Sequence, residues 1–326
     1  MSLKKIAEMT GVSVSTVSRV LNNKEYNCAS ADVKDKIWAA AKEIHYVPNE
    51  SARNLQKGNQ IAAPKPARQL AVILGRFDSL QRDPFFLELF RSVEQEIFAG
   101  GCVMSDFCTA GDLQNKKLPK AEGYIILGRS SEHLLKKMKK ATKNIIAIDR
   151  NPTDFEIDEV ICDGKEAAAL AMDYLIEKGH EKIAYIGDCS YETRYVGYCN
   201  SLIQHRLPLD YSSVYPTDQT TDAGYTAMKK LLERDAVHAV LCANDATALG
   251  AVRALGKYRK KTDIDLISID NIQAAEEVSP LLTTVNIPKK DMGKMAVKIL
   301  LDRMNHGHTE TMRVEFPPRL IRRESC

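Results

Sequence analysis

Residues 3–22 decide the fold of the N-terminal part of the chain, and they read LKKIAEMTGVSVSTVSRVLN. The apolar positions predict a first helix that Ser2 caps and that ends at Thr10-Gly11. They predict a second helix from Val14 to Asn22 with Ser13 as its cap. Two helices joined by a short turn that contains Gly are typical of a helix-turn-helix unit. A third amphipathic helix, over 30–44, can cover the other two.

Charge is divided unevenly between this N-terminal part and the rest of the chain. Residues 1–68 hold eleven Lys and Arg against six Asp and Glu, although the net charge of all 326 residues is only +3. A small basic head on a slightly acidic body is typical of a nucleic-acid-binding module joined to a sensing domain. A solvated helical surface with extra lysines is the alternative explanation.

Composition excludes several classes of protein. Apolar residues make up 44% and charged residues 27%, which is ordinary for a globular chain, and the length suggests two or three folded units. The apolar runs are too short to span a bilayer, and no apolar stretch follows the N-terminal lysines as in a secretory signal. Eight cysteines occur without a C-x-x-C pair, so we expect reduced thiols and no metal site. We also expect a cytoplasmic protein with no cofactor and no membrane partner.

The N-terminal segment resembles the helix-turn-helix of the lactose/galactose repressor family, LacI/GalR. His45-Tyr-Val-Pro-Asn49 and Ala52-Arg-Asn-Leu55 match the segment that follows it in that family. The resemblance implies that the second helix enters the major groove and reads bases through Val14, Ser15 and Arg19. These residue types suit that role, because Arg forks to guanine and Val can contact a thymine methyl. A surface ion pair for Arg19 and a core contact for Val14 are the alternatives. Phosphate contacts are expected from Ser13, Thr16 and Asn22.

A hinge follows the head. Residues 49–57 predict a short helix that Gly58 closes, and residues 58–68 are a small, polar, Pro-containing linker. Nine residues do not form a stable helix alone in water. The resemblance implies that this helix folds on the operator beside its dimer mate in the minor groove, with Asn49 and Ala52 at the DNA and Leu55 as the wedge in a base step. Packing of Ala52 and Leu55 on the body is the alternative.

The body alternates strands with helices, which favours doubly wound parallel sheets in two lobes. Strands are expected over 70–74, 102–107, 124–127, 145–148, 159–162, 183–186, 239–242 and 266–269. Helices are expected over 85–99, 131–141, 165–178, 192–205, 222–234, 245–257 and 289–305. The expected domains are a head over 1–47, a hinge and linker over 48–68, and a core over 69–326. Within the core we expect a first lobe of 69–150 and 286–310 and a second lobe of 151–285 and 311–326.

Polar residues follow several of these strands. They include Asp149, Asn244 and Asp270, while Arg194 opens the helix after another strand. Ligands of open α/β sheets bind outside the carboxyl ends of strands. Carboxylates there can accept sugar hydroxyls and Arg can donate two bonds in a fork. Capping of the next helix is the alternative for any single residue, and Asp245 in particular can be only a cap.

The family resemblance extends over the body and implies a two-lobed core similar to periplasmic sugar-binding proteins. It is carried by Asp83-Pro-Phe-Phe, Gly179-His, Arg194-x-x-Gly-Tyr, Ala243-Asn-Asp, Pro280-Leu-Leu-Thr-Thr-Val and Met292-Gly. The resemblance implies that Arg194, Asn244 and Asp270 hold sugar hydroxyls and that Asp149, Pro84 and Phe85 line the first lobe's side.

The sequence departs from the family at two places. Residues 109–122 are too few for the full helix that many members carry there, a shortening that resembles a galactoside-responding branch. Gln219 stands where many members have an aromatic residue. The chain stops at Cys326 without leucine heptads, so we expect a homodimer and a near-palindromic operator on double-stranded DNA.

These features predict a transcriptional repressor of a carbohydrate-utilisation operon, released from DNA by a small sugar. An enzyme is disfavoured, because the chain has no Gly-rich phosphate loop, H-E-x-x-H or G-x-S-x-G motif. A transport binding protein does not account for the basic head. A regulator that a non-sugar or phosphorylated corepressor tightens on DNA stays open as the alternative.

Overall fold

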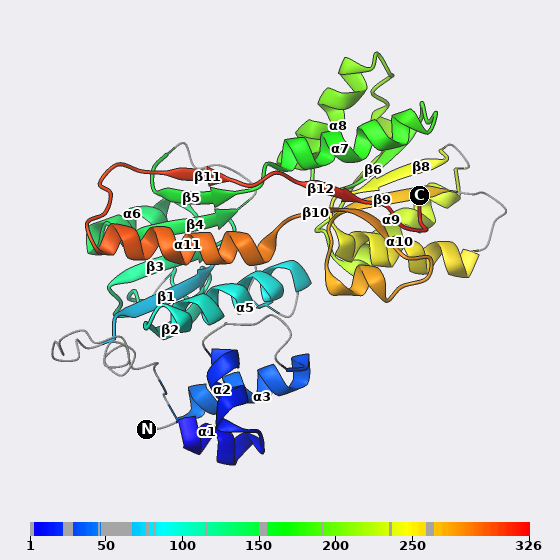
Figure 1. Ribbon diagram of the computed structural model, residues 1–326. Coiled ribbons are helices and arrows are strands. Elements are labelled where there is room, and N and C mark those ends of the chain that lie inside the picture. The colour runs from blue at the N-terminus through cyan, green and yellow to red at the C-terminus, as the bar shows by residue number, and fades with distance from the viewer. Residues whose placement is uncertain are drawn as a thin grey trace.

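The computed structural model describes residues 3–21, 29–44, 46, 67–75, 79–80, 83–114, 116–149, 155–190, 192–234, 237–258 and 264–326, without the side chains of residues 31, 42 and 149. The contacts predicted for Asn22, Asn49, Ala52 and Leu55, and the hinge helix as a whole, lie outside these residues. A small helical head lies below a core of two lobes (Figure 1).

The head consists of three helices, α1 (Leu3–Thr10), α2 (Val14–Leu21) and α3 (Ala31–Glu43), as the sequence predicts. Gly11 makes the turn between the first two with a φ of 68°, where a Cβ would be strained. Ile6, Val17, Leu21 and Ile37 form the buried centre, each no more than 2% exposed. The head contacts the core through Trp38, whose ring packs edge-on against that of Phe98 at 4.9 Å.

The first lobe is a parallel sheet of six strands in the order β11-β5-β4-β3-β1-β2. Its strands are β1 (Gln69–Leu74), β2 (Val103–Thr109), β3 (Gly123–Leu127), β4 (Ile145–Asp149), β5 (Asp158–Ile161) and β11 (Arg313–Glu315). Alternate residues of β1 point to opposite faces. Val72 joins the core cluster of α5 (Pro84–Ala99) and α11 (Lys289–Met304), and Ile73 joins that of α6 (Glu132–Ala141).

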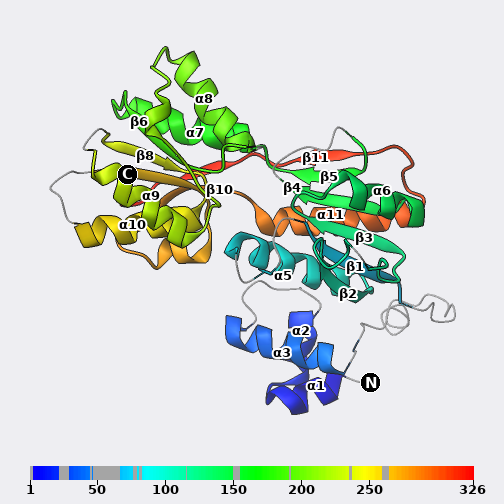
Figure 2. The same cartoon turned by 180° about the vertical axis from the view of Figure 1, so that it is seen from behind.

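The second lobe is a sheet in the order β12-β10-β9-β8-β6-β7, with only β12 antiparallel to its neighbour. Its strands are β6 (Ile183–Gly187), β7 (Val214–Pro216), β8 (Ala239–Cys242), β9 (Asp265–Asp270), β10 (Thr283–Asn286) and β12 (Arg319–Ile321). The helices α7 (Gly164–Glu177) and α8 (Thr193–Gln204) lie on one face, and α9 (Thr221–Leu232) and α10 (Asp245–Tyr258) lie on the other (Figures 1 and 2). Two short 3₁₀ turns, η2 (Tyr211–Ser213) and η3 (Gln273–Glu276), complete it.

Each strand and helix predicted for the body is present in the described part of the chain, with ends that differ by one or two residues. The expected division into lobes is wrong at two places. Residues 158–161 and 313–315 belong to the first sheet, because β5 pairs with both β4 and β11. The chain therefore crosses between the lobes after β5, after β10 and after β11. Four strands of three or four residues, β7, β10, β11 and β12, were not predicted.

The shortened connection is confirmed, since the described residues between 110 and 122 contain turns and no helix. None of the described helices has the length and apolar character that crossing a membrane requires.

Candidate ligand site and nucleic-acid interface

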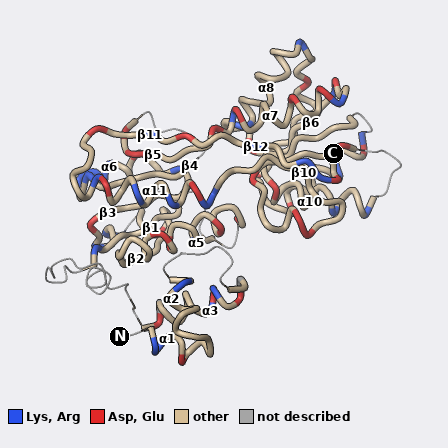
Figure 3. Tube along the Cα trace, in the orientation of Figure 1, with Lys and Arg blue, Asp and Glu red and all other residues tan. Residues whose placement is uncertain are grey.

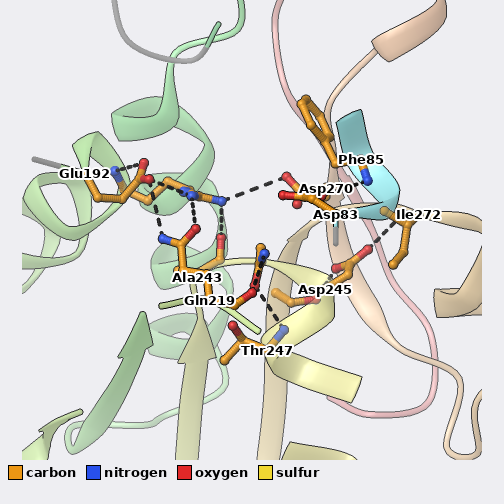
Figure 4. Close-up of polar contacts among 12 residues, drawn as sticks. Asp83, Phe85, Glu192, Gln219, Ala243, Asp245, Thr247, Asp270 and Ile272 are labelled. Carbon is orange, nitrogen blue, oxygen red and sulfur yellow. Dashed lines mark hydrogen bonds and ion pairs between the residues drawn. The ribbon is translucent and has the colours of Figure 1, made fainter. Parts of the chain in front are cut away.

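Arg194 is the centre of a buried polar cluster at the carboxyl ends of the second lobe's strands. Figure 4 shows the partners Glu192, Gln219, Ala243 and Asp270 around it. Arg194 lies in the first turn of α8, where Glu192 caps the helix, and none of its surface is exposed. Its guanidinium donates to Glu192 Oε2 at 2.6 Å, to Gln219 Oε1 at 3.0 Å and to the carbonyl of Ala243. Asp270 Oδ1 lies 3.9 Å from Nη1. Nε has no hydrogen-bond partner among the described residues.

The charges of this cluster hold Arg194 in its protonated form. Burial by itself would lower the pKa of Arg194, but the Glu192 and Asp270 carboxylates outweigh it and raise that pKa above its ordinary value. Glu192 and Asp270 are themselves almost completely buried. The neighbouring residues therefore fix the orientation of the Arg194 guanidinium.

Gln219 occupies the place of the missing aromatic residue and joins the cluster. It is 4% exposed and has a φ of 64°, and besides bonding Arg194 it donates to Glu192 at 3.4 Å. Its own carbonyl accepts a bond of 3.2 Å from Asn244 Nδ2. From the sequence, Gln219 was recognised only as a departure from the family, and Glu192 was not predicted to belong to the site. The signal for Glu192 was its polarity two residues before Arg194, after a predicted strand, whereas Gln219 carried no such local signal.

Asn244 and Asp245 follow β8 but have different roles. Asn244 Oδ1 accepts from Thr247 N at 3.0 Å, so Asn244 caps α10, and the alternative that Asp245 is only a cap is not supported. Asp245 is fully buried and accepts from Ser268 Oγ, from Thr284 Oγ1 at 2.6 Å and from Ile272 N at 2.8 Å. These bonds tie α10 to β9 and β10. Burial raises the pKa of Asp245 despite them.

Lys289, which sequence reasoning missed, connects the two lobes beside Asp270. It is the first residue of α11, and its Nζ donates to the carbonyls of Asp270 at 2.6 Å and Asn271 at 2.9 Å. The same atom lies 3.4 Å from Glu88 Oε2 and 5.6 Å from the ring centre of Phe85, both on α5 of the first lobe. A single lysine thus contacts both lobes.

The predicted site residues of the first lobe lie at the start of α5 and at the end of β4. Asp83 caps α5 by accepting from Phe85 N at 2.9 Å, and Pro84 occupies the first turn. Phe85 is only 2% exposed and packs edge-on against Phe86, and Figure 4 shows it beside Asp270. Asp149 ends β4, and its side chain is outside the described part of the molecule. The structure therefore brings Arg194, Asn244 and Asp270 together and links Phe85 to them through Lys289.

This arrangement suits a polar ligand. Two carboxylates, two amides and a guanidinium converge where parallel strands end, and ligands of such sheets bind there. Carboxylate oxygens accept hydroxyl hydrogens and the guanidinium donates in a fork. The described residues hold no group of three or more His, Cys, Asp or Glu side chains that could bind a metal ion.

In the head, the outer face of α2 carries the predicted base-reading residues. Val14 is 41% exposed, and Ser15 and Arg19 are exposed as well. Val17 and Val20 are buried in the centre of the head. The core-contact alternative for Val14 is therefore disfavoured. Arg19 forms no ion pair with another described residue, and the ion-pair alternative for it stays open.

Ser13 and Thr16 are bonded to each other at the start of α2. Ser13 Oγ accepts from Thr16 N at 3.1 Å and lies 2.8 Å from both Thr16 Oγ1 and Ser15 Oγ. These bonds cap the helix, and they place three hydroxyl groups together at its N-terminus, where the orphan backbone N–H groups favour an anion such as a phosphate.

Both the head and the core resemble known protein domains. Residues 2–49 match the model of bacterial regulatory proteins of the lacI family, and residues 172–326 match that of the periplasmic binding protein-like domain. The HTH-type transcriptional repressor PurR of Photorhabdus laumondii is 29% identical, over 99% of this chain and 96% of that protein.

Two solved structures have a similar fold. The transcriptional regulator CelR in complex with cellobiose is 25% identical with a TM-score of 0.71, over all of both chains. A LacI-family regulator from Enterococcus faecium with bound ribose is 26% identical with a TM-score of 0.71, over 79% of this chain and 98% of that one. The exposed α2 face, the two-lobed core and these matches together show that the chain joins a LacI-family helix-turn-helix domain to a periplasmic binding protein-like domain.

Proposed function

We propose that the protein is an operator-binding repressor of a carbohydrate-utilisation operon and that a small sugar bound between the lobes releases it from DNA. The observation that carries this proposal is the buried Arg194, held by Glu192 and Gln219 with Asp270 3.9 Å away. Val14, Ser15 and Arg19 are the proposed base contacts. The proposed effector contacts are Pro84, Phe85, Asp149, Arg194, Asn244 and Asp270. We add Gln219 and Lys289 to the proposal because they bond to Arg194 and to the carbonyl of Asp270.

The charge of the site supports a neutral, polyhydroxylated ligand. Two carboxylates already surround Arg194, so a phosphate would meet negative charge at the centre of the cluster. The similar CelR and Enterococcus faecium structures hold cellobiose and ribose, both sugars. The shortened connection between β2 and β3 makes galactosides the first sugars to test.

The mechanism is thermodynamic linkage between the two sites. We propose that the sugar binds more tightly to an arrangement of the lobes that does not suit operator binding. Sugar must then weaken operator binding by the same factor by which the operator weakens sugar binding. The effect is bounded by the difference between the sugar's affinities for the two arrangements. We propose a homodimer, whose two heads read half-sites about one helical turn apart.

A corepressor-dependent regulator is the second candidate. The observation that favours it is Gln219, whose buried amide stands where many relatives carry an aromatic side chain on which a sugar can stack. In that case the ligand tightens operator binding instead of releasing it.

The deciding experiment is operator binding by the full-length protein, using DNA from its own gene neighbourhood. Lactose, galactose and other simple sugars are titrated at one salt concentration, because affinity for DNA depends steeply on salt. Release by a sugar supports induction. Tightening by any ligand, or a response only to purines or sugar phosphates, would support the corepressor mode and refute the sugar.

A further inference from the structure

A second basic surface lies on the first lobe, in addition to the basic head. The segment 111–144 contains eight lysines and one arginine against three acidic residues, an excess larger than that of residues 1–68. We call it the lysine patch, and it comprises Lys116, Lys117, Lys120, Lys136, Lys137, Lys139, Lys140 and Lys143. Figure 3 shows blue segments gathered at this end of the lobe, around α6.

The two stretches that form the patch are held together by hydrogen bonds. Lys137 Nζ donates to the carbonyl of Leu113 at 3.1 Å and to that of Lys116. Asn144 Nδ2 donates to the carbonyl of Glu122 at 3.0 Å. The loop before β3 and the C-terminal end of α6 therefore lie side by side, so their lysines form one surface.

Five of these eight lysines form no ion pair with an acidic residue in the described part of the chain, and one of the five, Lys137, bonds to carbonyls instead. Three others form exposed ion pairs, Lys116 with Asp112, Lys136 with Glu132 and Lys139 with Glu156, and such pairs contribute little. The exposed residues Lys117, Lys120, Lys140 and Lys143 make no ion pair or hydrogen bond with any residue that the structure describes. Their mutual repulsion is therefore not neutralised within this part of the chain.

The patch lies where the chain arrives from the DNA-binding head. Gln69 begins β1 directly after the linker, and its N–H donates to Glu122 Oε1 at 3.1 Å. Glu122 N donates in turn to the carbonyl of Gln69 at 2.8 Å. Lys120 and Lys143 precede β3 and β4, so they lie at the N-terminal ends of the first sheet's parallel strands. β1 begins at the same end, and it is the first strand after the head and the linker in sequence.

The composition of this surface fits nucleic acid better than protein. Protein interfaces are depleted of Lys and are built around apolar and aromatic side chains. None of the large apolar residues that the structure shows as exposed belongs to the segment 111–144. Duplex DNA carries one negative charge for about every 1.7 Å of its axis, which matches a row of flexible ammonium groups.

We propose that the lysine patch binds the phosphate backbone of DNA flanking the operator. The contact is independent of sequence and adds to the affinity that the head supplies. It rests on operator binding by the head, which the experiment measures separately.

The experiment compares full-length proteins on two duplexes. One carries the operator alone, and the other carries it with about two helical turns (roughly 20 base pairs) of DNA on each side. The patch variant combines Lys117→Gln, Lys120→Gln, Lys140→Gln and Lys143→Gln. The control variant removes four exposed lysines of the second lobe, with Lys165→Gln, Lys182→Gln, Lys229→Gln and Lys230→Gln.

We expect the unaltered protein to bind the flanked duplex more tightly than the bare operator. On the flanked duplex, the patch variant should lower the slope of log affinity against log salt by about 0.9 for each phosphate that the protein no longer neutralises. On the bare operator it should bind like the unaltered protein, and the control variant should keep the preference for flanks. Equal affinity of the unaltered protein for both duplexes would overturn the proposal, as would an equal weakening in the patch and control variants.

Discussion

Lys289 donates a hydrogen bond of 2.6 Å to the carbonyl of Asp270, so the first residue of α11 is bonded to the strand end that carries a proposed ligand contact. The same ammonium reaches Glu88 of the other lobe at 3.4 Å. Glu88 also accepts from Gln273 N at 3.0 Å. The relative position of the lobes is therefore connected directly to the geometry of the ligand site.

Replacement of this lysine should loosen the connection. Lys289→Met removes the ammonium and leaves the carbonyls of Asp270 and Asn271 without their donor, which should lower the free energy of unfolding by about 1–3 kcal/mol. Release of operator by the effector should need a different ligand concentration. Urea unfolding and operator titration measure the two effects. Lys298→Met, an exposed position on the same helix, is the control, and identical behaviour of the two variants would contradict the role given to Lys289.

Arg194→Met should abolish the response to effector while operator binding persists. It should also destabilise the core by about 3–5 kcal/mol, because it leaves the Glu192 carboxylate buried without its partner. The double variant with Glu192→Gln should recover part of that stability without recovering the response. Such a split separates loss of ligand binding from loss of folding. Full induction of the single variant at the usual sugar concentration would show that the ligand binds elsewhere.

Arg19→Ala should weaken specific binding by about 1–3 kcal/mol and relax the preference at one base position. The expectation follows from its exposure on α2 beside Val14 and Ser15. Affinities for operators substituted one base pair at a time measure it. Lys5→Ala on α1 is the matched control, and it should not alter the preference at that base position. If Arg19→Ala weakened operator and random DNA equally, a base contact by Arg19 would be refuted.

His308 should make stability depend on pH. It lies 2.7 Å from Asp302 and 3.1 Å from the buried Asp158, which also binds Arg303. Burial by itself would lower the pKa of His308, but its hydrogen bonds to Asp302 and Asp158 outweigh that effect and raise it above 6.5. A raised pKa means that its stabilising effect is complete below the unfolded value of 6.5 and is lost as the pH rises through the folded value.

The measurement is the difference in unfolding free energy between the unaltered protein and His308→Gln. The difference should be larger near about pH 5.5 than near about pH 8.5. His306→Gln, an exposed position in the same loop, controls for general effects of the substitution. A difference that does not change with pH would show that His308 stabilises the loop without a proton.

Much of the candidate site was predictable because local patterns encode it. Asp270 ends β9, Asn244 comes two residues after β8, and Arg194 opens the helix after β6. The carboxyl ends of parallel strands meet at one edge of a sheet. Lys289 carried no such signal, because its role depends on an ammonium group reaching two lobes that are distant in sequence. The same is true of Gln219, whose backbone conformation turns its side chain towards Arg194.

The sequence by itself determined the head, the alternation of strands and helices, and the family resemblance, because periodicity, caps and motifs are properties of short segments. Tertiary structure alone decided which sheet receives β5 and β11, since a strand of three or four residues is specified by its neighbours more than by its own pattern. It also decided that lysines from a loop and from α6 form one surface. Both outcomes depend on contacts between segments that are distant in sequence, and such contacts form only in the folded chain.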